Sequence, residues 1–219
     1  ARELGGDLCD FLKPDPHTFV VAVGDVSGKG VPAALYSAAI GEMVRGRTFR
    51  RRLEKEASSP STVLTAMNRI LHERNLEEYY CTLCYAMFDL KGRTVTFANS
   101  GLPYPIRYRQ GKGEPIDMPG VPLGSFGASQ YDEVLLDLQV DDVFVFFSDG
   151  ISEAFDEAGA EFGTDRLMEV LERHHAHKSQ EIVGEILNAL TRFCGDAPQS
   201  DDRTVVVAPR TAGRVLRVD

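Results

Sequence analysis

GDVSGKG, at residues 24–30, joins an apolar run, HTFVVAV, to an alanine-rich segment, VPAALYSAAI. A glycine-rich turn between a predicted strand and a predicted helix suggests a phosphate-binding loop, which has the pattern G-x-x-x-x-G-K-[ST]. Here Gly24 and Gly28 are too close in sequence for that pattern, and glycine follows Lys29 where serine or threonine is needed. The stretch does not fit a P-loop. What remains is a carboxylate, Asp25, at the end of a strand.

The composition describes a folded, acidic chain. With 219 residues and 43% apolar residues, and without a linker-like stretch, residues 1–219 are expected to form one domain. The formal net charge of −9 disfavours a nucleic acid or an anionic membrane surface as the partner. No export signal or apolar span is present in the sequence, so we expect a cytoplasmic protein. The opening ARELGGD suggests a domain cut from a longer chain with an upstream regulatory region.

Four cysteines raise the alternatives of a disulfide or a zinc site. Cys81 and Cys84 have C-x-x-C spacing, but they lie in YYCTLCYAMFDL, which has the β-branched and aromatic content of a strand. Residues three apart on a strand point to opposite faces, so these two thiols cannot easily share a metal ion. Buried, reduced cysteines are the favoured interpretation.

Hydrophobic periodicity predicts an α+β fold. Short turns such as LKGRT and RQGKGE join most strands directly to strands, which predicts mainly antiparallel sheets, and the helices are grouped away from them. The predicted strands are residues 18–23, 81–89, 94–99, 104–108, 133–138, 143–147 and 204–208. The predicted helices are residues 32–50, 61–75 with a Ser-Thr cap at its start, 165–175 and 180–194.

Aspartates recur at the ends of apolar strands, beside glycine or serine. Asp7 lies in LGGDLCDF, Asp25 closes TFVVAVGD, Asp149 closes VFVFFSDG, and Asp201 and Asp202 precede TVVV. Any one of them alone could be a turn or cap residue. Together at one rim they would repel one another unless hard divalent cations such as Mg²⁺ or Mn²⁺ lay between them. We therefore favour a metal site.

Other aspartates lack this setting. Asp10, Asp89 and Asp117 are expected to be turn or surface residues.

The motifs resemble a known family in order and content. GGDLCDF, GDVSGKGVPAAL, ANSG-LPYPI, PLG, FFSDGISEAFDEAGAEFGTDRL and SDDRT are similar to the sporulation-stage-II-E-like branch of the metal-dependent type 2C protein phosphatases, over nearly the whole chain. The resemblance implies an α-β-β-α sandwich, with two mainly antiparallel sheets flanked by helices. It also implies two Mn²⁺ or Mg²⁺ ions at one rim.

The same resemblance assigns roles to residues. Asp25 resembles the ligand that bridges both metals, with the Val26 carbonyl completing one site. Asp149 and Asp201 resemble ligands of the second metal, and Asp7 reaches a metal or its water. Asp25 and Asp149 are thereby the catalytic candidates. The ligand is expected three residues before the threonine of SDDRT, which selects Asp201 over its neighbour.

Two positions differ from the patterns of the wider family. Leu102 stands where the family often has histidine, and Ser27 stands where eukaryotic type 2C enzymes have a histidine proposed as general acid. Protonation of the leaving group is therefore unassigned. Lys29 is a candidate for steering the phosphate dianion, although a lysine at a helix start more often points to solvent.

Two functions follow as hypotheses. The first is a phosphoserine/phosphothreonine protein phosphatase that acts without a covalent protein nucleophile. Its implied substrate is an anti-anti-sigma-like protein in bacterial stress or developmental signalling, and its implied regulators are an upstream sensory domain or regulatory protein, with a homodimer as a further candidate assembly. The second is a catalytically silent, partner-binding module with the same fold. The first is favoured because every expected metal aspartate is present.

Overall fold

The structure is a computed structural model and describes residues 5–50, 59–74, 79–209 and 216–218. The chain divides into two compact units. The N-terminal unit comprises Arg2–Leu102 and Met118–Leu138, and the C-terminal unit comprises Pro103–Asp117 and Gln139–Asp219. Each unit has one antiparallel sheet and its own helices, so each is described by itself.

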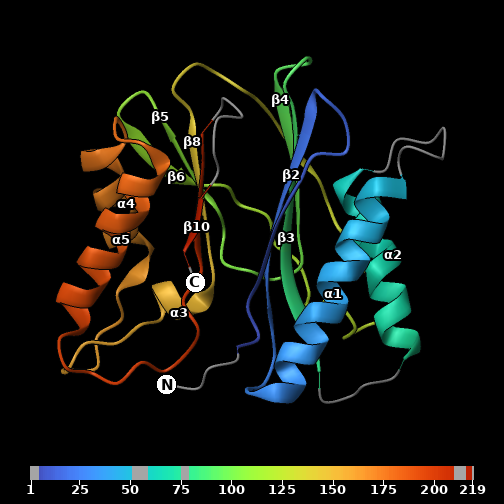
Figure 1. The fold of residues 1–219 in the computed structure, drawn as a ribbon, viewed down its shortest axis with the longest axis horizontal. Coiled ribbons are helices and arrows are strands. Elements are labelled where there is room, and N and C mark those ends of the chain that lie inside the picture. The colour runs from blue at the N-terminus through green and yellow to red at the C-terminus, as the bar shows by residue number, and fades with distance from the viewer. Residues whose placement is uncertain (1–4, 51–58, 75–78, 210–215, 219) are drawn as a thin grey trace. The chain divides into compact units, whose positions relative to one another are not determined.

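The N-terminal unit has a five-stranded sheet in the order β1-β2-β3-β4-β7. Two helices, α1 and α2, pack on one face of this sheet and bury a core against it (Figure 1). Strand β2 is apolar over most of its length because it lies inside the sheet, between β1 and β3. The elements are β1 (Leu8–Leu12), β2 (Thr18–Val26), α1 (Val31–Arg50), α2 (Pro60–Glu73), β3 (Cys81–Asp89), β4 (Thr94–Asn99) and β7 (Val134–Asp137).

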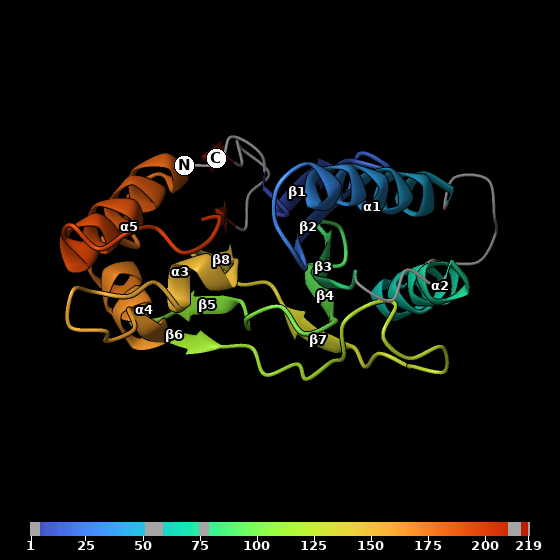
Figure 2. The same ribbon diagram turned by 90° about the horizontal axis from the view of Figure 1, so that it is seen from below.

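The C-terminal unit has a second five-stranded sheet in the order β10-β9-β8-β5-β6. Helices α4 and α5 pack against each other and against this sheet (Figure 2). Strand β8 is buried at every residue and lies between β9 and β5. The elements are β5 (Ile106–Arg109), β6 (Lys112–Pro115), β8 (Val143–Phe147), α3 (Asp149–Ser152), α4 (Gly163–His174), α5 (Ser179–Cys194), β9 (Val205–Pro209) and β10 (Leu216–Val218).

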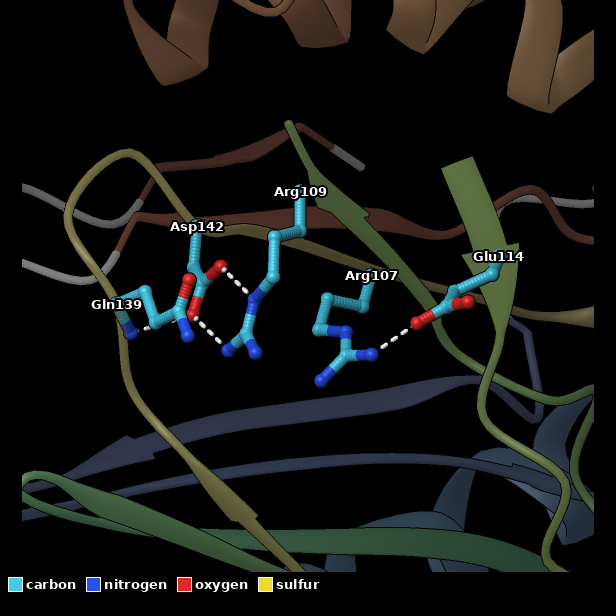
Figure 3. A network of polar contacts seen from close by, with 5 residues as sticks. All are labelled: Arg107, Arg109, Glu114, Gln139 and Asp142. Atoms are coloured by element: carbon cyan, nitrogen blue, oxygen red, sulfur yellow. Dashed lines mark hydrogen bonds and ion pairs between the residues drawn. The ribbon is translucent and has the colours of Figure 1, made fainter. Parts of the chain in front are cut away.

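A polar network fixes the turn that leads into β8. The side chain of Asp142 is fully buried and accepts two 2.7 Å bonds from the guanidinium of Arg109, one from Nε and one from Nη2 (Figure 3). It also accepts a 2.7 Å bond from the backbone N–H of Gln139. A neighbouring ion pair joins Arg107 to Glu114 across the β5–β6 hairpin. The buried Asp142 carboxylate is thus paired with a guanidinium, which is the condition for burying a charge at low cost.

Each predicted strand and helix is present in the structure, and the structure adds three strands and one short helix. Strands β1, β6 and β10 and helix α3 were not predicted. The segment that includes β6 was interpreted as a turn, but Lys112–Pro115 pairs with β5 in a tight hairpin. Helix α2 begins earlier than its predicted cap, because Ser59 is the N-cap and its hydroxyl accepts from the N–H of Thr62.

The prediction for Asp10 is wrong. It is not a surface residue, since it lies in β1 with 8% of its surface exposed and forms a 2.8 Å ion pair with Arg45 of α1. Asp89 is a turn residue as predicted, accepting from the N–H groups of Lys91 and Gly92. Asp117 is exposed, also as predicted. Among the residues described, no helix combines the length and the apolar character needed to cross a membrane.

Candidate metal centre

Asp7 and Asp25 face each other across two neighbouring strands of the N-terminal unit. The β1–β2 register pairs Leu8 with Gly24, so the next pair along the ladder is Asp7 with Asp25. Residues opposite each other on antiparallel strands have Cβ atoms about 4.5–5.5 Å apart, and like charges in that position are destabilising. Leu8 and Val26 contribute to the core under the helices, so by alternation the two carboxylates project from the other face.

The carbonyl oxygen of Val26 lies close to this pair, beside Gly6. The N–H of Val26 donates to the Gly6 carbonyl at 3.3 Å, which continues the ladder past Asp7. A Cβ atom added to Gly6 would lie 2.4 Å from the Val26 carbonyl oxygen and 3.0 Å from Oδ1 of Asp25. These two oxygens therefore approach one point beside Gly6. Oxygen donors at such close quarters are the ligands that Mg²⁺ and Mn²⁺ prefer.

The turn after Asp25 is fixed by strand β3 and its preceding residue. Ser27 donates from its backbone N–H to the Tyr80 carbonyl at 3.0 Å, and its hydroxyl accepts from the Tyr80 N–H at 3.0 Å. Gly28 and Gly30 both have positive φ, 94° and 79°, which turns the chain into α1. Lys29 lies exposed on this turn. The Ser27 hydroxyl therefore acts as a structural acceptor here.

Asp149 and Asp201 come together at the end of β8 in the C-terminal unit. A Cβ atom on Gly150 would lie 1.8 Å from the Asp202 carbonyl oxygen, so the chain after Asp149 runs directly against the 201–202 backbone. Ser148 binds the same segment: its N–H donates to the Thr204 carbonyl and its hydroxyl accepts from the Thr204 N–H, both at 3.0 Å. The residues on either side of Asp149, Ser148 and Gly150, thus hold the Asp201 backbone beside it.

The pKa of a neighbouring glutamate, Glu153, reports on the negative charge around Asp149 and Asp201. Burial raises the pKa of the nearby Glu153 carboxyl, and the negative charges of Asp149, Glu161 and Asp201 raise it further. The carboxylates are thus close enough to disfavour ionisation of a third one. Glu153 was not predicted as part of the site, although it follows Asp149 by one helical turn in the DGISE motif.

The predicted ligands are divided between the two units: Asp7, Asp25 and Val26 lie in the N-terminal unit, and Asp149 and Asp201 in the C-terminal unit. Over the part of the chain that the structure describes, no group of three or more His, Cys, Asp or Glu side chains forms a metal site. The four predicted aspartates thus fall two to each unit. That these residues bind the same metal ions stays a prediction.

The prediction of buried, reduced cysteines is confirmed for three of the four, since Cys9 is only partly buried. All four are free thiols, and Cys81, Cys84 and Cys194 are buried. Burial raises the pKa of the Cys81 and Cys84 thiols well above the usual range, so both are protonated and unreactive near neutral pH. A zinc or disulfide role for the C-x-x-C pair is thereby disfavoured.

Comparison with known proteins identifies relatives along most of the chain. A family model described as Stage II sporulation protein E (SpoIIE) matches residues 15–211. Phosphoserine phosphatase RsbU of Bacillus subtilis is 29% identical over 96% of this chain and 61% of its own length. Phosphoserine phosphatase RsbP of the same organism is 24% identical over 94% of this chain and 49% of its own. The chain thus spans about half to three fifths of these relatives.

Solved structures share the fold. The PP2C phosphatase domain of SpoIIE from Bacillus subtilis superposes with a TM-score of 0.80 at 20% identity, covering 98% of this chain and 58% of that one. RsbX, solved in complex with magnesium, gives a TM-score of 0.67 at 18% identity and covers 95% and 89% of the two chains. These likenesses confirm the predicted α+β, type 2C phosphatase fold. The relatives' names agree with the predicted serine/threonine phosphatase class.

Proposed function

Since the chain belongs to the SpoIIE family and has the fold of its PP2C phosphatase domains, we propose that it is a metal-dependent phosphoserine/phosphothreonine protein phosphatase. The observation that supports this most directly is the pair Asp7 and Asp25, two carboxylates opposite each other on adjacent strands with the Val26 carbonyl beside them. The proposal includes both units as one phosphatase domain over residues 1–219, because the family match extends across both.

The proposed ligands are the predicted ones. Two ions, Mn²⁺ or Mg²⁺, would be held by Asp7, Asp25, the Val26 carbonyl, Asp149 and Asp201. Such ions supply activated water and neutralise the phosphoryl oxygens during an in-line displacement. The donor set fits this role, since it consists of oxygen atoms and includes no histidine or thiolate.

Within this proposal, residues of the chain bind the metal ions, hold the turn beside them and attract the substrate phosphate. The carboxylates of Asp25 and Asp149 supply the negative charge that binds the cations. Ser27 fixes the turn through its hydrogen bond with Tyr80, and the exposed Lys29 attracts the phosphate dianion. Ser27 offers a hydroxyl and not an imidazole at the position of the histidine proposed as general acid in eukaryotic type 2C enzymes, so the proposal leaves protonation of the leaving group to solvent.

The proposed substrate is a phosphorylated anti-anti-sigma-like protein in sigma-factor regulation. Two curated relatives are named phosphoserine phosphatases, and a solved structure with a TM-score of 0.76 is described as the RsbU and RsbW domains of a Mycobacterium tuberculosis protein. An upstream sensory domain or regulatory protein, a homodimer and a cytoplasmic setting belong to the same proposal. The SpoIIE structure includes a fragment of that protein's regulatory domain.

The test is hydrolysis of p-nitrophenyl phosphate by the purified chain with Mn²⁺, with Mg²⁺ and with excess EDTA. Turnover that requires either metal is expected, and the metal should also raise the melting temperature because it binds the folded state. Full activity in EDTA would contradict the metal dependence. A metal-induced rise in melting temperature with no turnover on any phosphomonoester would instead favour the catalytically silent module.

A further inference from the structure

A threonine on strand β3 lies directly opposite Asp25. The β2–β3 ladder pairs Thr82 with Asp25. Cys81 and Leu83, on either side of Thr82, belong to the core under the helices, so by alternation the Thr82 side chain projects from the other face. This is also the face of the Asp7 and Asp25 carboxylates. Asp7, Asp25 and Thr82 therefore form one row across three strands, on one face of the sheet.

The Thr82 hydroxyl binds the main chain of Asp25. Its Oγ1 donates to the Asp25 carbonyl oxygen at 3.4 Å. From the next residue, the N–H of Val26 donates to the Gly6 carbonyl at 3.3 Å. The Asp25 carbonyl and the Val26 N–H belong to one planar peptide unit. This unit joins two predicted metal ligands, and it is held by a side chain of β3 on one side and by the Gly6 backbone on the other.

Gly24 lets β3 approach β2 closely beside Thr82. A Cβ atom added to Gly24 would lie 2.6 Å from the Thr82 carbonyl oxygen and 2.9 Å from Cδ1 of Leu83. The two strands therefore meet at a distance that a side chain at position 24 would not permit. On the other side of the pair, Ser27 and Tyr80 form two 3.0 Å hydrogen bonds. Thr82 thus lies between two points at which β2 and β3 are fixed to each other.

The hydroxyl is what distinguishes threonine from valine at this position. Thr82 is half-buried in a strand, where valine has nearly the same shape and a similar preference for the β conformation. Valine would pack there, but it could not donate to a carbonyl. Because the Cβ of threonine is branched, its χ1 angle is restricted and the hydroxyl has few orientations. The hydroxyl, rather than the bulk of the side chain, is therefore the group that acts on Asp25.

Ligands of metal ions depend on neighbouring residues that hold them in place. Loss of such a neighbour typically weakens metal binding about ten- to a hundredfold. Asp25 has a particular need of one, because Asp7 lies opposite it and the two like charges repel each other until a cation binds. A hydroxyl suits this role, since it is neutral and does not replace the cation as a lysine or arginine would.

We propose that Thr82 is a positioning residue for Asp25, and that its hydroxyl holds the peptide unit between Asp25 and Val26 in the orientation that binds a metal ion. This rests on the metal site of the proposed function and adds to it a residue that is not itself a ligand. Because Thr82 acts through Asp25, it should affect metal binding even when no substrate is present.

Two replacements of Thr82 separate the hydroxyl from the shape of the side chain. Thr82→Val removes the hydroxyl and keeps the branched shape, whereas Thr82→Ser keeps the hydroxyl and loses the branching that favours a strand. The matched control is Thr96→Val, because Thr96 is a half-buried threonine on β4 of the same sheet. Thr96 pairs with Met87, and the distance along β3 from Met87 to Thr82 is about 16 Å.

The experiment measures the dissociation constant of Mn²⁺ for the free protein, from the electron paramagnetic resonance signal of unbound Mn²⁺ and without substrate. We expect Thr82→Val to raise this constant about tenfold or more, whereas Thr82→Ser and Thr96→Val should stay close to the wild type. The melting temperatures of the metal-free variants should follow a different order, with Thr82→Ser below Thr82→Val. The Mn²⁺ concentration for half-maximal turnover of p-nitrophenyl phosphate should shift as the dissociation constant does.

Three outcomes would overturn the proposal. The first is wild-type Mn²⁺ affinity in Thr82→Val, and the second is an equal loss of affinity in Thr96→Val. The third is weaker binding by Thr82→Ser than by Thr82→Val, because a merely structural role predicts that affinity follows stability. Failure of the proposed function is distinct, since the wild type would then bind Mn²⁺ without hydrolysing any phosphomonoester. A wild type that binds no Mn²⁺ would overturn both.

Discussion

The two aspartate pairs are held in place by different means. Asp7 and Asp25 lie on adjacent strands, so the β1–β2 ladder fixes their separation through backbone bonds. Asp201 lies outside any strand, and it is kept near Asp149 by the Ser148 hydroxyl and by the absence of a side chain at Gly150. The first pair depends on sheet register and the second on two specific residues. Substitutions around the second pair should therefore disturb it more easily.

The largest expected effect is common to both pairs. Asp25→Asn and Asp149→Asn should each reduce metal-dependent turnover about a thousandfold or more, because each removes a charge needed to hold a cation. Neither variant should unfold, since asparagine keeps the shape and removes like-charge repulsion. Turnover of p-nitrophenyl phosphate and the melting temperature with and without Mn²⁺ are the measurements. Near wild-type turnover at saturating metal in either variant would remove that residue from the proposed ligands.

Alanine substitutions at the glycines beside the two aspartate pairs should have different effects on stability and turnover. Gly150→Ala would place a Cβ atom 1.8 Å from the Asp202 carbonyl, so the 201–202 backbone must move. We expect a loss of about 1–3 kcal/mol in the free energy of unfolding, with a large loss of turnover. At Gly6 the overlap is smaller, since the corresponding distance to the Val26 carbonyl oxygen is 2.4 Å, so Gly6→Ala should cost less.

Gly184 is the control for these two variants. It lies within α5, and a Cβ atom there would meet nothing within 4 Å. Gly184→Ala should stabilise the protein by up to about 1 kcal/mol, because alanine is the better helix former. Chemical denaturation measures all three variants. Equal losses at Gly6 and Gly150 would contradict the expectation that the larger overlap at Gly150 costs more.

The sequence predicted the strand-end aspartates but not the contacts that pair them. Apolar periodicity indicated β2, β3 and β8 correctly, so Asp25 and Asp149 were placed at strand ends. Strand β1 was missed because LCDFL is short and contains an aspartate. The burial of Asp10 depends on Arg45, 35 residues further along the chain, and no local pattern contains that information. The opposition of Asp7 and Asp25 follows from this unpredicted strand.

The contacts of Gly150 and Asn68 were beyond sequence reasoning for the same reason. The glycine of FFSDG could be any turn residue until the chain at Asp202 is seen against it. Asn68 lies inside an amphipathic helix, where asparagine is unfavourable unless its amide finds partners. Its partners, Gly124 and Phe126, are 56 and 58 residues away. Such pairings are set by tertiary structure rather than by local propensity.

A smaller effect should distinguish the side chains that support the pairs. Ser148→Ala removes the hydroxyl that accepts from the Thr204 N–H and leaves that buried donor unpaired. The expected cost is about 1–3 kcal/mol, together with a higher Mn²⁺ concentration for half-maximal turnover. Ser37→Ala is the counterpart, since its hydroxyl donates to the Asp7 carbonyl at 3.3 Å. Because the ladder also holds Asp7, Ser37→Ala should leave the Mn²⁺ requirement unchanged, and an equal shift in both would contradict the comparison.

The smallest effect concerns Glu153, the third carboxylate beside the Asp149 pair. Its pKa is raised in the folded state by burial and by the charges of Asp149, Glu161 and Asp201, so its ionisation opposes folding. Below the ordinary glutamate pKa of about 4.3 this penalty is absent, and it develops as the pH rises through the folded-state pKa.

Glu153→Gln should therefore raise the melting temperature of the metal-free protein slightly near neutral pH and leave it unchanged near pH 3. Salt at about 1 M should reduce the gain by screening, and Mn²⁺ should reduce it by neutralising the neighbouring aspartates. Glu169→Gln is a control of opposite sign, because Glu169 pairs with Arg173 on the exposed side of α4 and its loss should slightly lower the melting temperature. A gain at Glu153 that is independent of pH and of Mn²⁺ would mean that repulsion by the Asp149 pair is not its cause.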